Sequence, residues 1–289
     1  MKLLVTGARG MLGIDLCDIL SEDYDVVGVD IEEGDISSVS ETRELVERIS
    51  PEIVIHCAAY TDVDKSESEI ERALVVNGQG TRNVALACKG IGSALLYVST
   101  DYVFDGKSDR PYTETDVPAP IGAYGASKLE GERHIQGLLS NFFIVRTSWL
   151  FGLHGRNFVD TIIGLGQDRD SIEVVDDQVG CPTFTRDLGF ALSVVVRSKN
   201  YGIYHVCNSE RCSWYDFATE ILRLWGNSEA KVVPVETARL KRPAARPPFS
   251  VLDTSLFERT FGFSLRSWRE ALAEYLELKK AREARGTHW

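Results

Sequence analysis

The sequence has no long uninterrupted apolar run. Its longest apolar stretches, such as GFALSVVV at 189–196, fall well short of the roughly 20 residues that a membrane-spanning helix requires. The first residues, MKLLVTG, run directly into a glycine motif and show no signal-peptide cleavage pattern. We therefore expect no membrane association and a cytoplasmic location.

Cysteine and histidine are few and dispersed. Neither the six cysteines nor the five histidines show the close spacing of a zinc site, and the cysteines do not form a redox dithiol pattern. Several cysteines lie inside apolar runs such as VIHCAA, which indicates buried thiols in a reducing compartment. We expect no bound metal.

The chain also has fewer basic than acidic residues. The chain has 32 Lys and Arg residues against 43 Asp and Glu residues, a net charge of -11. Nucleic-acid binding depends on clustered Lys and Arg that contact phosphates, so we expect no nucleic-acid partner. With 289 residues, 44% of them hydrophobic, the chain can form one large domain or two smaller ones around a sizeable core.

The first half of the chain alternates between two patterns. Short apolar runs typical of strands buried on both faces are KLLVTG, DVVGVD, EIVIHCAA, ALLYVST and FFIVRTSWLF. Between them, apolar positions at helical spacing occur at 11–21, 40–49, 67–89 and 122–139. Strand and helix in regular order predict an α/β fold, a Rossmann-like doubly wound parallel sheet.

After about residue 150 the alternation weakens and turn residues become frequent. We therefore predict a dinucleotide-binding domain at 1–150 and a smaller, mainly substrate-binding lobe at 151–289, with a strand near 202–207 returning to the first domain. A lobe over the carboxyl edge of a parallel sheet creates a ligand crevice. The last segment, 274–289, is expected to form a charged amphipathic helix that frays into a tail.

The first chemical motif, GARGMLG, follows the first predicted strand and opens the first predicted helix. That context favours a dinucleotide-binding loop over glycines that merely end a strand, because the backbone can approach a pyrophosphate at a helix N-terminus. The motif comprises Gly7, Ala8, Arg9, Gly10, Met11, Leu12 and Gly13.

The coenzyme preference depends on two residues of opposite charge. Asp30 ends the second predicted strand, where a carboxylate can hold the adenosine ribose hydroxyls and repel a 2′-phosphate. Arg9 in the glycine loop can instead neutralise that phosphate, or be a solvated loop cation. Both NADPH and NADH therefore stay open as the cofactor.

A second constellation combines Thr100, at the end of the fourth predicted strand, with Tyr124 and Lys128. Residues four apart share one face of a helix, so the tyrosine hydroxyl and the lysine ammonium can be neighbours. A nearby cation lowers a tyrosine pKa, which suits the proton transfer of carbonyl reduction. If these residues are considered alone, helix packing explains the Tyr-Lys spacing and strand packing explains Thr100. Because they follow a dinucleotide-binding motif in the chain, the catalytic interpretation is favoured.

These motifs together resemble a known family. GARGMLG, STDYVF, PYTETDVPAPIGAYGASKLEGE and RTSWLFG look like the extended short-chain dehydrogenase/reductases, and with DDQVGCPTFTRDL and ARPPFSVLDTSLF they are similar to the dTDP-4-dehydrorhamnose reductases over nearly the whole chain. The resemblance implies NAD(P)H-dependent reduction of the C4 ketone of dTDP-4-dehydro-L-rhamnose to dTDP-L-rhamnose. Tyr124 would protonate the C4 oxygen, Lys128 would lower the tyrosine pKa and hold the nicotinamide ribose, and Thr100 would bond the substrate oxygen.

The resemblance also implies two groups of binding residues. Besides the glycine loop and Asp30, the cofactor groove would contain Asp35, Ile36, Cys57, Ala58, Ala59, Tyr60, Thr61 and Asn77. The dTDP-sugar would contact Val63, Asp101, Tyr102, Phe104, Trp149, Asn157, Thr183 and Arg246. Arg246 can offer a planar fork to a diphosphate, and Trp149, expected at the end of the fifth strand, can cover a sugar face. A surface arginine and a core tryptophan are the alternatives.

The chain departs from the family pattern at Leu150 and Phe151, where Val-Tyr is more frequent. It also offers no match for the acidic residues with which some bacterial members bridge a dimer through a metal, so a homodimer is one open assembly. Two other functions stay open. One is a sugar-nucleotide epimerase or a reductase of another 4-keto sugar, and the other is a regulatory subunit like the noncatalytic one of methionine adenosyltransferase.

Overall fold

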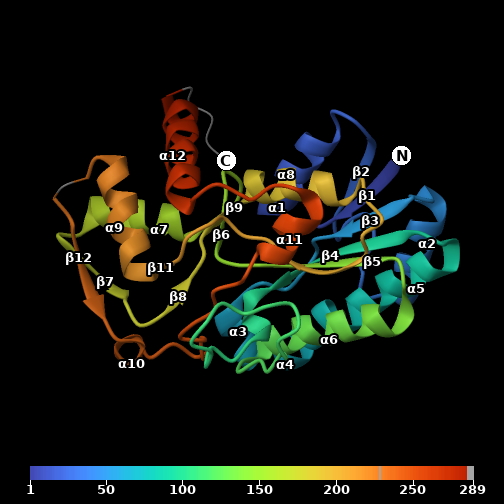
Figure 1. Cartoon of the computed structure of the whole chain (residues 1–289), viewed down its shortest axis with the longest axis horizontal. Helices are drawn as coiled ribbons and strands as arrows, with labels where there is room; N and C mark the ends of the chain where they lie inside the picture. The colour runs from blue at the N-terminus through green and yellow to red at the C-terminus, as the bar shows by residue number, and fades with distance from the viewer. Residues whose placement is uncertain (228, 285–289) are drawn as a thin grey trace.

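The larger of two lobes is built on a parallel sheet. The computed structural model describes residues 1–227 and 229–284, and in this part of the chain six strands pair in the order β10-β5-β4-β3-β1-β2 (Figure 1). Every pairing in this sheet is parallel. The strand order reverses beside β1, and the Rossmann-like doubly wound fold is confirmed. The strands are β1 (Lys2–Thr6), β2 (Asp25–Val29), β3 (Ile53–His56), β4 (Ala94–Thr100), β5 (Phe142–Thr147) and β10 (Gly202–His205).

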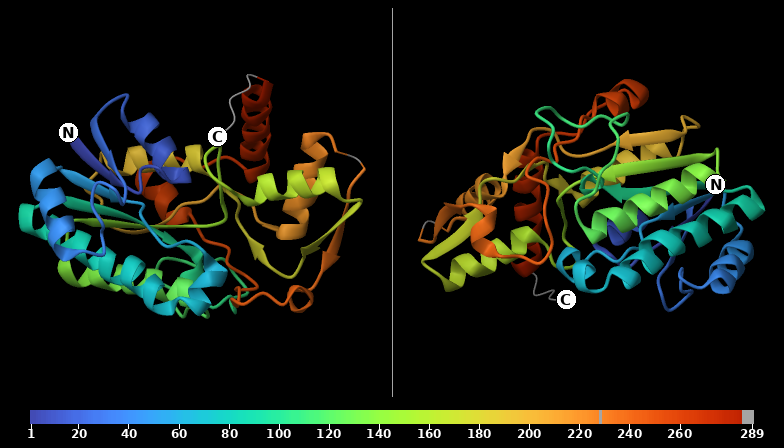
Figure 2. Two further views of the ribbon diagram at one scale, coloured as in Figure 1. Left: turned by 180° about the vertical axis from the view of Figure 1, so that it is seen from behind. Right: turned by 90° about the horizontal axis from the view of Figure 1, so that it is seen from below.

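Helices cover both faces of this sheet (Figure 2). Alternate residues of β1 separate the two cores: Leu3 belongs to the core on one face and Leu4 to the core on the other. The core around Leu3 includes α1 (Met11–Leu20), α8 (Thr185–Val195) and α11 (Ser255–Phe261). The core around Leu4 includes α2 (Val39–Ile49), α5 (Thr81–Ile91) and α6 (Ala123–Leu138).

The helix predicted at 67–89 is interrupted. The structure has α3 (Val63–Ser68), α4 (Ile70–Ala73) and a π-helical segment, η1 (Leu74–Gly80), before α5 begins. The wider turn of η1 contains the buried Asn77, whose side chain bonds the loop after β3 rather than solvent. A tertiary contact of this kind is invisible in the local apolar spacing.

The strand predicted at 142–151 is also split. Strand β5 ends at Thr147, and Trp149 follows in a left-handed backbone conformation with φ of 49°. The chain then enters β6 (Leu150–Phe151), which pairs with β9 (Thr183–Phe184). The prediction that Trp149 ends the fifth strand is therefore wrong, because the chain turns away from the sheet two residues earlier.

The smaller lobe combines short strand pairs with helices (Figure 1). Its strands, apart from β6 and β9, are β7 (Ser171–Val175), β8 (Val179–Gly180), β11 (Cys212–Ser213) and β12 (Lys231–Val235), paired as β7 with β12 and β8 with β11. Its helices are α7 (Phe158–Asp168), α9 (Trp214–Trp225), α10 (Thr237–Leu240) and α12 (Trp268–Ala284). Because β10, α8 and α11 pack in the larger lobe, the second half of the chain contributes to both.

The charged helix predicted near the C-terminus is present as α12, and most of the cysteines are buried. Helix α12 ends at Ala284, and the tail expected after it, at 285–289, lies outside the described residues. Four cysteines are buried, whereas Cys17 and Cys57 are half-buried. Among the residues described, no helix has both the length and the apolar character needed to cross a membrane.

Candidate active site

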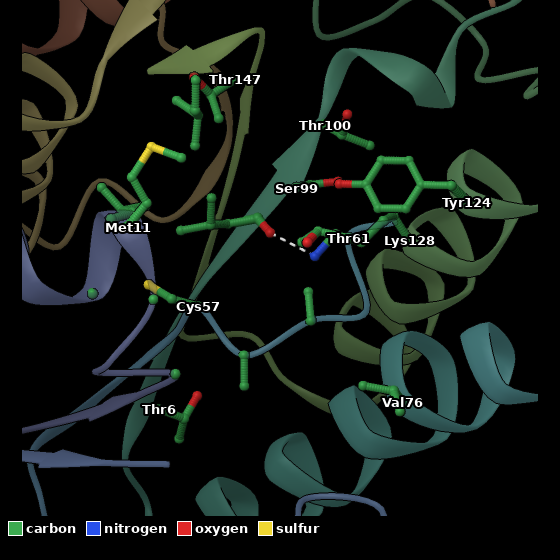
Figure 3. A pocket seen from close by; sticks show the side chains of 18 of the residues that line it. Thr6, Met11, Cys57, Thr61, Val76, Ser99, Thr100, Tyr124, Lys128 and Thr147 are labelled. Carbon is green, nitrogen blue, oxygen red and sulfur yellow. Dashed lines mark hydrogen bonds between the residues drawn. The ribbon is translucent and has the colours of Figure 1, made fainter. Parts of the chain in front are cut away.

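A cavity of about 680 Å³ opens at the carboxyl edge of the parallel sheet. Its wall contains the last residues of β1, β4 and β5, namely Thr6, Thr100 and Thr147, together with the start of α1. In Figure 3, Met11 and Cys57 lie on one side, with Tyr124 and Lys128 on the other. This is where open α/β folds bind their ligands.

The glycine loop lies against the neighbouring backbone too closely for side chains. Gly7 has φ of 70°, and a Cβ there would lie 2.6 Å from the amide nitrogen of Ala58. A Cβ on Gly13 would lie 2.1 Å from the carbonyl oxygen of Gly7. Helix α1 begins at Met11, and no side chain in the described part of the protein caps it at Gly10. The loop and the helix N-terminus thus fit the pyrophosphate of a dinucleotide.

Of the two charged residues expected to decide the coenzyme preference, the acidic one lines the cavity and the arginine pairs with residues outside it. Asp30 lines the cavity and accepts hydrogen bonds from the backbone amides of Arg9 and Ile31 at 3.1 and 2.9 Å. The Arg9 guanidinium is exposed and pairs with Glu32 and Glu33. It is not among the described residues that line the cavity.

The remaining residues expected around the cofactor fall into lining and supporting positions. Those that line the cavity are Gly7, Gly10, Met11, Leu12, Gly13, Asp35, Ile36, Cys57, Ala58, Ala59 and Thr61. Asn77 lies behind them: its amide nitrogen donates to the Tyr60 carbonyl at 3.0 Å and to the Ser127 hydroxyl at 2.9 Å, and its oxygen accepts from the Tyr60 amide at 2.8 Å. Asn77 therefore joins the loop after β3 to helix α6.

Thr100, Tyr124 and Lys128 come together on the cavity wall (Figure 3). Tyr124 lies in the first turn of α6, and Thr100 is the last residue of β4. The buried Lys128 ammonium donates to the Val98 carbonyl at 2.8 Å and lies 4.1 Å from the centroid of the Tyr97 ring. The structure thus brings together the three side chains that the sequence analysis groups.

Removal from water is the largest cause of the shifted pKa values of Tyr124 and Lys128. It raises the pKa of Tyr124 to about 12, with a further rise from the charge of Asp101 and an opposing effect of the Thr100 hydroxyl. Burial also lowers the pKa of Lys128 to about 7. The Tyr124 pKa thus moves opposite to the direction expected from a neighbouring cation, because removal from water disfavours the charged form of both groups. At neutral pH Tyr124 carries its proton.

Four of the residues expected to contact the sugar nucleotide also line the cavity: Val63, Asp101, Tyr102 and Trp149. The Tyr102 ring meets the Tyr124 ring edge-on, with centroids 5.9 Å apart and an interplanar angle of 78°. Asp101 is buried, and burial raises its pKa to about 7. These side chains belong to the same cavity wall as Thr100, Tyr124 and Lys128.

The other four are not among the described cavity-lining residues. Phe104 is buried in a stack with Tyr112, with ring centroids 4.2 Å apart. Asn157 caps helix α7, and Thr183 is buried in β9. Arg246 is held by two hydrogen bonds of 2.9 and 2.8 Å to the carboxylate of Asp64.

Sequence reasoning missed several residues of the cavity wall. Ser99 and Thr147 occupy strand ends that the apolar pattern already indicated, so they could have been found by extending the edge argument. Trp214, the first residue of α9, also lines the cavity. Its only local signal is the capping box formed by Ser213 and Asp216, which marks a helix start but not a site.

The described residues contain no cluster of three or more His, Cys, Asp or Glu side chains arranged to hold a metal ion. The side chains that line the cavity offer hydroxyl, phenol, ammonium, carboxyl and thiol groups.

Comparison with known proteins agrees with this geometry. The family model described as the RmlD substrate binding domain matches residues 1–280. The chain is 42% identical to a dTDP-4-dehydrorhamnose reductase of Streptomyces griseus, covering 94% of this chain and 92% of the relative. It is 39% identical to a dTDP-4-keto-6-deoxy-D-glucose reductase of Streptomyces niveus, covering 98% and 99%. A crystal structure of dTDP-4-dehydrorhamnose reductase from Bacillus anthracis in complex with NADP is similar, with a TM-score of 0.92, 42% identity, and coverage of 95% of this chain and 98% of that one. The resemblance found in the sequence is thus confirmed, and the chain belongs to the RmlD substrate binding domain family, that of the dTDP-4-dehydrorhamnose reductases.

Proposed function

We propose that this protein reduces the C4 ketone of dTDP-4-dehydro-L-rhamnose to dTDP-L-rhamnose with NADPH or NADH. The observation that carries the proposal is the meeting of Thr100, Tyr124 and Lys128 on one wall of a cavity that also contains the glycine loop. Similar proteins named dTDP-4-dehydrorhamnose reductase support the substrate, and the NADP complex of one of them supports the cofactor.

In this mechanism a bound nicotinamide would supply the hydride that adds to C4 of the sugar. The Tyr124 hydroxyl donates its proton to the C4 oxygen as negative charge develops there, and its raised pKa keeps that proton available at neutral pH. The Thr100 hydroxyl donates a hydrogen bond to the same oxygen. The ammonium group of Lys128 would hold the ribose hydroxyls beside the nicotinamide, and Asp30 would hold those of the adenosine.

The binding residues follow from the same proposal. The cofactor would be held by the cavity-lining residues of the glycine loop, by Asp35 and Ile36 and by the loop after β3, and Asn77 fixes that last loop from behind. Val63, Asp101, Tyr102 and Trp149 contact the dTDP-sugar. For Phe104, Asn157 and Thr183 we propose a supporting role, because all three are buried. A cytoplasmic location and a homodimeric assembly remain parts of the proposal.

A reductase acting on another 4-keto sugar is the second candidate. The similarity to the dTDP-4-keto-6-deoxy-D-glucose reductase, at 39% identity over almost the whole of both chains, favours it. A reductase exchanges its coenzyme in each cycle, whereas an epimerase regenerates a bound one. The coenzyme content of the purified protein therefore separates both reductase candidates from an epimerase.

The direct test supplies purified protein with each 4-keto sugar and follows the oxidation of NADPH and of NADH separately. Oxidation coupled to formation of dTDP-L-rhamnose supports the proposal. If only dTDP-4-keto-6-deoxy-D-glucose is turned over, that sugar replaces dTDP-4-dehydro-L-rhamnose as the assigned substrate. No oxidation with any combination would leave a noncatalytic binding protein as the better interpretation.

Coenzyme preference is expected to change when Arg9 is released. In the double variant Glu32→Gln, Glu33→Gln the guanidinium loses both acidic partners, and two negative charges near the adenosine ribose are removed. We expect the KM for NADPH to fall several-fold, with a smaller effect on NADH, because only NADPH has a 2′-phosphate for Arg9 to bind. The variant Glu44→Gln, Glu47→Gln on α2 is the control with the same change in charge. An equal effect on both coenzymes would exclude this role of Arg9.

Arg246 is expected to bind the diphosphate of the substrate. Its side chain is one-tenth exposed and is already oriented by Asp64, with which it bridges the 242–246 segment to helix α3. Arg246→Ala should weaken dTDP binding by about tenfold, the scale of a lost charge-assisted hydrogen bond. Calorimetry with dTDP measures this, with the exposed Arg239→Ala as control. An unchanged dissociation constant would reject the assignment.

A further inference from the structure

Two tryptophans form a tight stack on the cavity wall. The rings of Trp149 and Trp214 have centroids 3.6 Å apart and an interplanar angle of 7°. Both residues line the cavity and both are half-buried. Trp149 lies between β5 and β6, whereas Trp214 begins α9 in the smaller lobe. The stack thus connects the edge of the catalytic sheet to the smaller lobe.

The backbone of Trp149 needs such a contact. Its φ of 49° lies in the left-handed region, where a residue with a Cβ is disfavoured. Residues hold such a conformation when their surroundings determine it, and they are frequent at ligand sites. The contacts of the indole contribute to holding Trp149 in this conformation, together with the hydrogen bond that its carbonyl accepts from the Thr183 amide at 3.2 Å.

Trp214 is itself fixed to the smaller lobe. Ser213 before it accepts a hydrogen bond from the Asp216 amide at 3.0 Å, and the Asp216 carboxylate accepts from the Ser213 amide at 3.1 Å. The Ser213 hydroxyl also donates to Asp176 at 2.6 Å. The Phe158 ring packs on the Trp214 indole with centroids 4.4 Å apart. Trp214 is thus a rigid support for its neighbour.

Gly180 contacts the same indole from strand β8. A Cβ at this position would lie 2.4 Å from Cε2 and 2.7 Å from Nε1 of Trp149. Gly180 does not have a positive φ, so its backbone accepts other residues and the space taken by the indole is what requires glycine. Gly180 and Trp214 therefore fix the position of Trp149 together.

We propose that Trp214 is a positioning residue that determines sugar specificity by holding Trp149 against the sugar of the bound nucleotide. The inference rests on the proposed function, in which Trp149 contacts that sugar. A fixed indole presents a defined apolar surface to the methyl group of a 6-deoxy sugar. The two candidate substrates differ in configuration at C5, so their methyl groups point in different directions and only one of them can meet this surface well. Thr100 and Tyr124 act on the C4 oxygen, and the tryptophan pair sets the orientation in which the sugar ring meets them.

The test compares ligands with and without the sugar. Calorimetry gives the dissociation constants of dTDP and dTDP-L-rhamnose for Trp214→Ala, Trp214→Phe and Gly180→Ala. We expect Trp214→Ala and Gly180→Ala to weaken binding of dTDP-L-rhamnose by about tenfold and to leave dTDP unchanged. Trp214→Phe, which preserves an aromatic stack, should restore most of the sugar-dependent affinity. The circular dichroism band of coupled indoles should disappear in both Trp214 variants.

Turnover supplies the second readout. With dTDP-4-dehydro-L-rhamnose, Trp214→Ala should raise KM more than it lowers kcat, and it should reduce the discrimination against dTDP-4-keto-6-deoxy-D-glucose. Trp225→Phe on the same helix and Gly164→Ala on α7, where an added Cβ meets no described atom within 4 Å, are the matched controls.

The outcomes separate the two proposals. A wild-type protein that oxidises neither coenzyme contradicts the proposed function, whereas the dissociation constants still report on Trp214. Sugar-dependent affinity unchanged in folded Trp214→Ala would overturn the inference. If that variant does not fold, Gly180→Ala supplies the test, because its added Cβ displaces Trp149 while Trp214 stays intact. Unchanged sugar-dependent affinity in Gly180→Ala would then overturn the inference. An equal loss of affinity for dTDP and dTDP-L-rhamnose would also overturn it.

Discussion

Tyr124→Phe is expected to lower the reductase kcat by roughly two to four orders of magnitude, the contribution of a positioned general acid. The variant removes the hydroxyl that we propose protonates the C4 oxygen, and it keeps the ring that packs edge-on against Tyr102. Since neither the glycine loop nor Asp30 is altered, the affinity for the coenzyme and the unfolding midpoint should stay close to those of the wild type.

Steady-state kinetics with dTDP-4-dehydro-L-rhamnose checks this prediction, and coenzyme titration checks that the variant is intact. Tyr201→Phe, which removes the hydroxyl of an exposed tyrosine, is the matched control. The pH dependence of kcat tests the same role. A general acid loses activity as the pH rises through its pKa, and desolvation raises the pKa of Tyr124 to about 12. Tyr124 should therefore stay an effective acid across the neutral range. A variant that turns over within a few-fold of the wild type would remove Tyr124 from this role.

The sequence was sufficient for the parallel sheet and for the residues at its carboxyl edge. Strands buried on both faces are continuous apolar runs, and a parallel sheet brings their ends to one edge. For this reason the apolar pattern and the chain order assign Asp30, Thr100 and the glycine loop to one cavity, where the structure places them. Tyr124 and Lys128 join them through the spacing of a helix that lies where the pattern predicts it.

The remaining features depend on contacts between distant segments. The π-helical turn at 74–80 accompanies the bonds of Asn77 to the loop after β3, which lies far away in the chain. Trp214 enters the cavity wall through a stack with Trp149, and neither partner carries a motif that identifies the other. The pKa of Tyr124 rises because of desolvation, which residue spacing does not report.

Loss of one charge from a buried ion pair behind the active site should cause the largest loss of stability. Glu132 on α6 and Arg146 on β5 are almost fully buried, and their two hydrogen bonds measure 2.9 and 2.6 Å. The Ser99 hydroxyl donates to the same carboxylate at 2.6 Å. Glu132 follows Tyr124 and Lys128 at intervals of four residues, so the pair fastens the helix that carries the proposed catalytic groups to the sheet.

Glu132→Gln is therefore expected to reduce the free energy of unfolding by about 3–5 kcal/mol, because the buried guanidinium loses its compensating charge. The double variant Glu132→Gln, Arg146→Met should recover part of this loss, since it removes the isolated charge as well. Urea unfolding of the single and double variants measures both effects. Glu47→Ala, which breaks an exposed pair with Arg43 on α2, should cost less than about 1 kcal/mol. A double variant less stable than Glu132→Gln would mean that Arg146 stabilises the fold mainly through its packing on Phe104 rather than through the ion pair, because its guanidinium lies 5.1 Å from that ring.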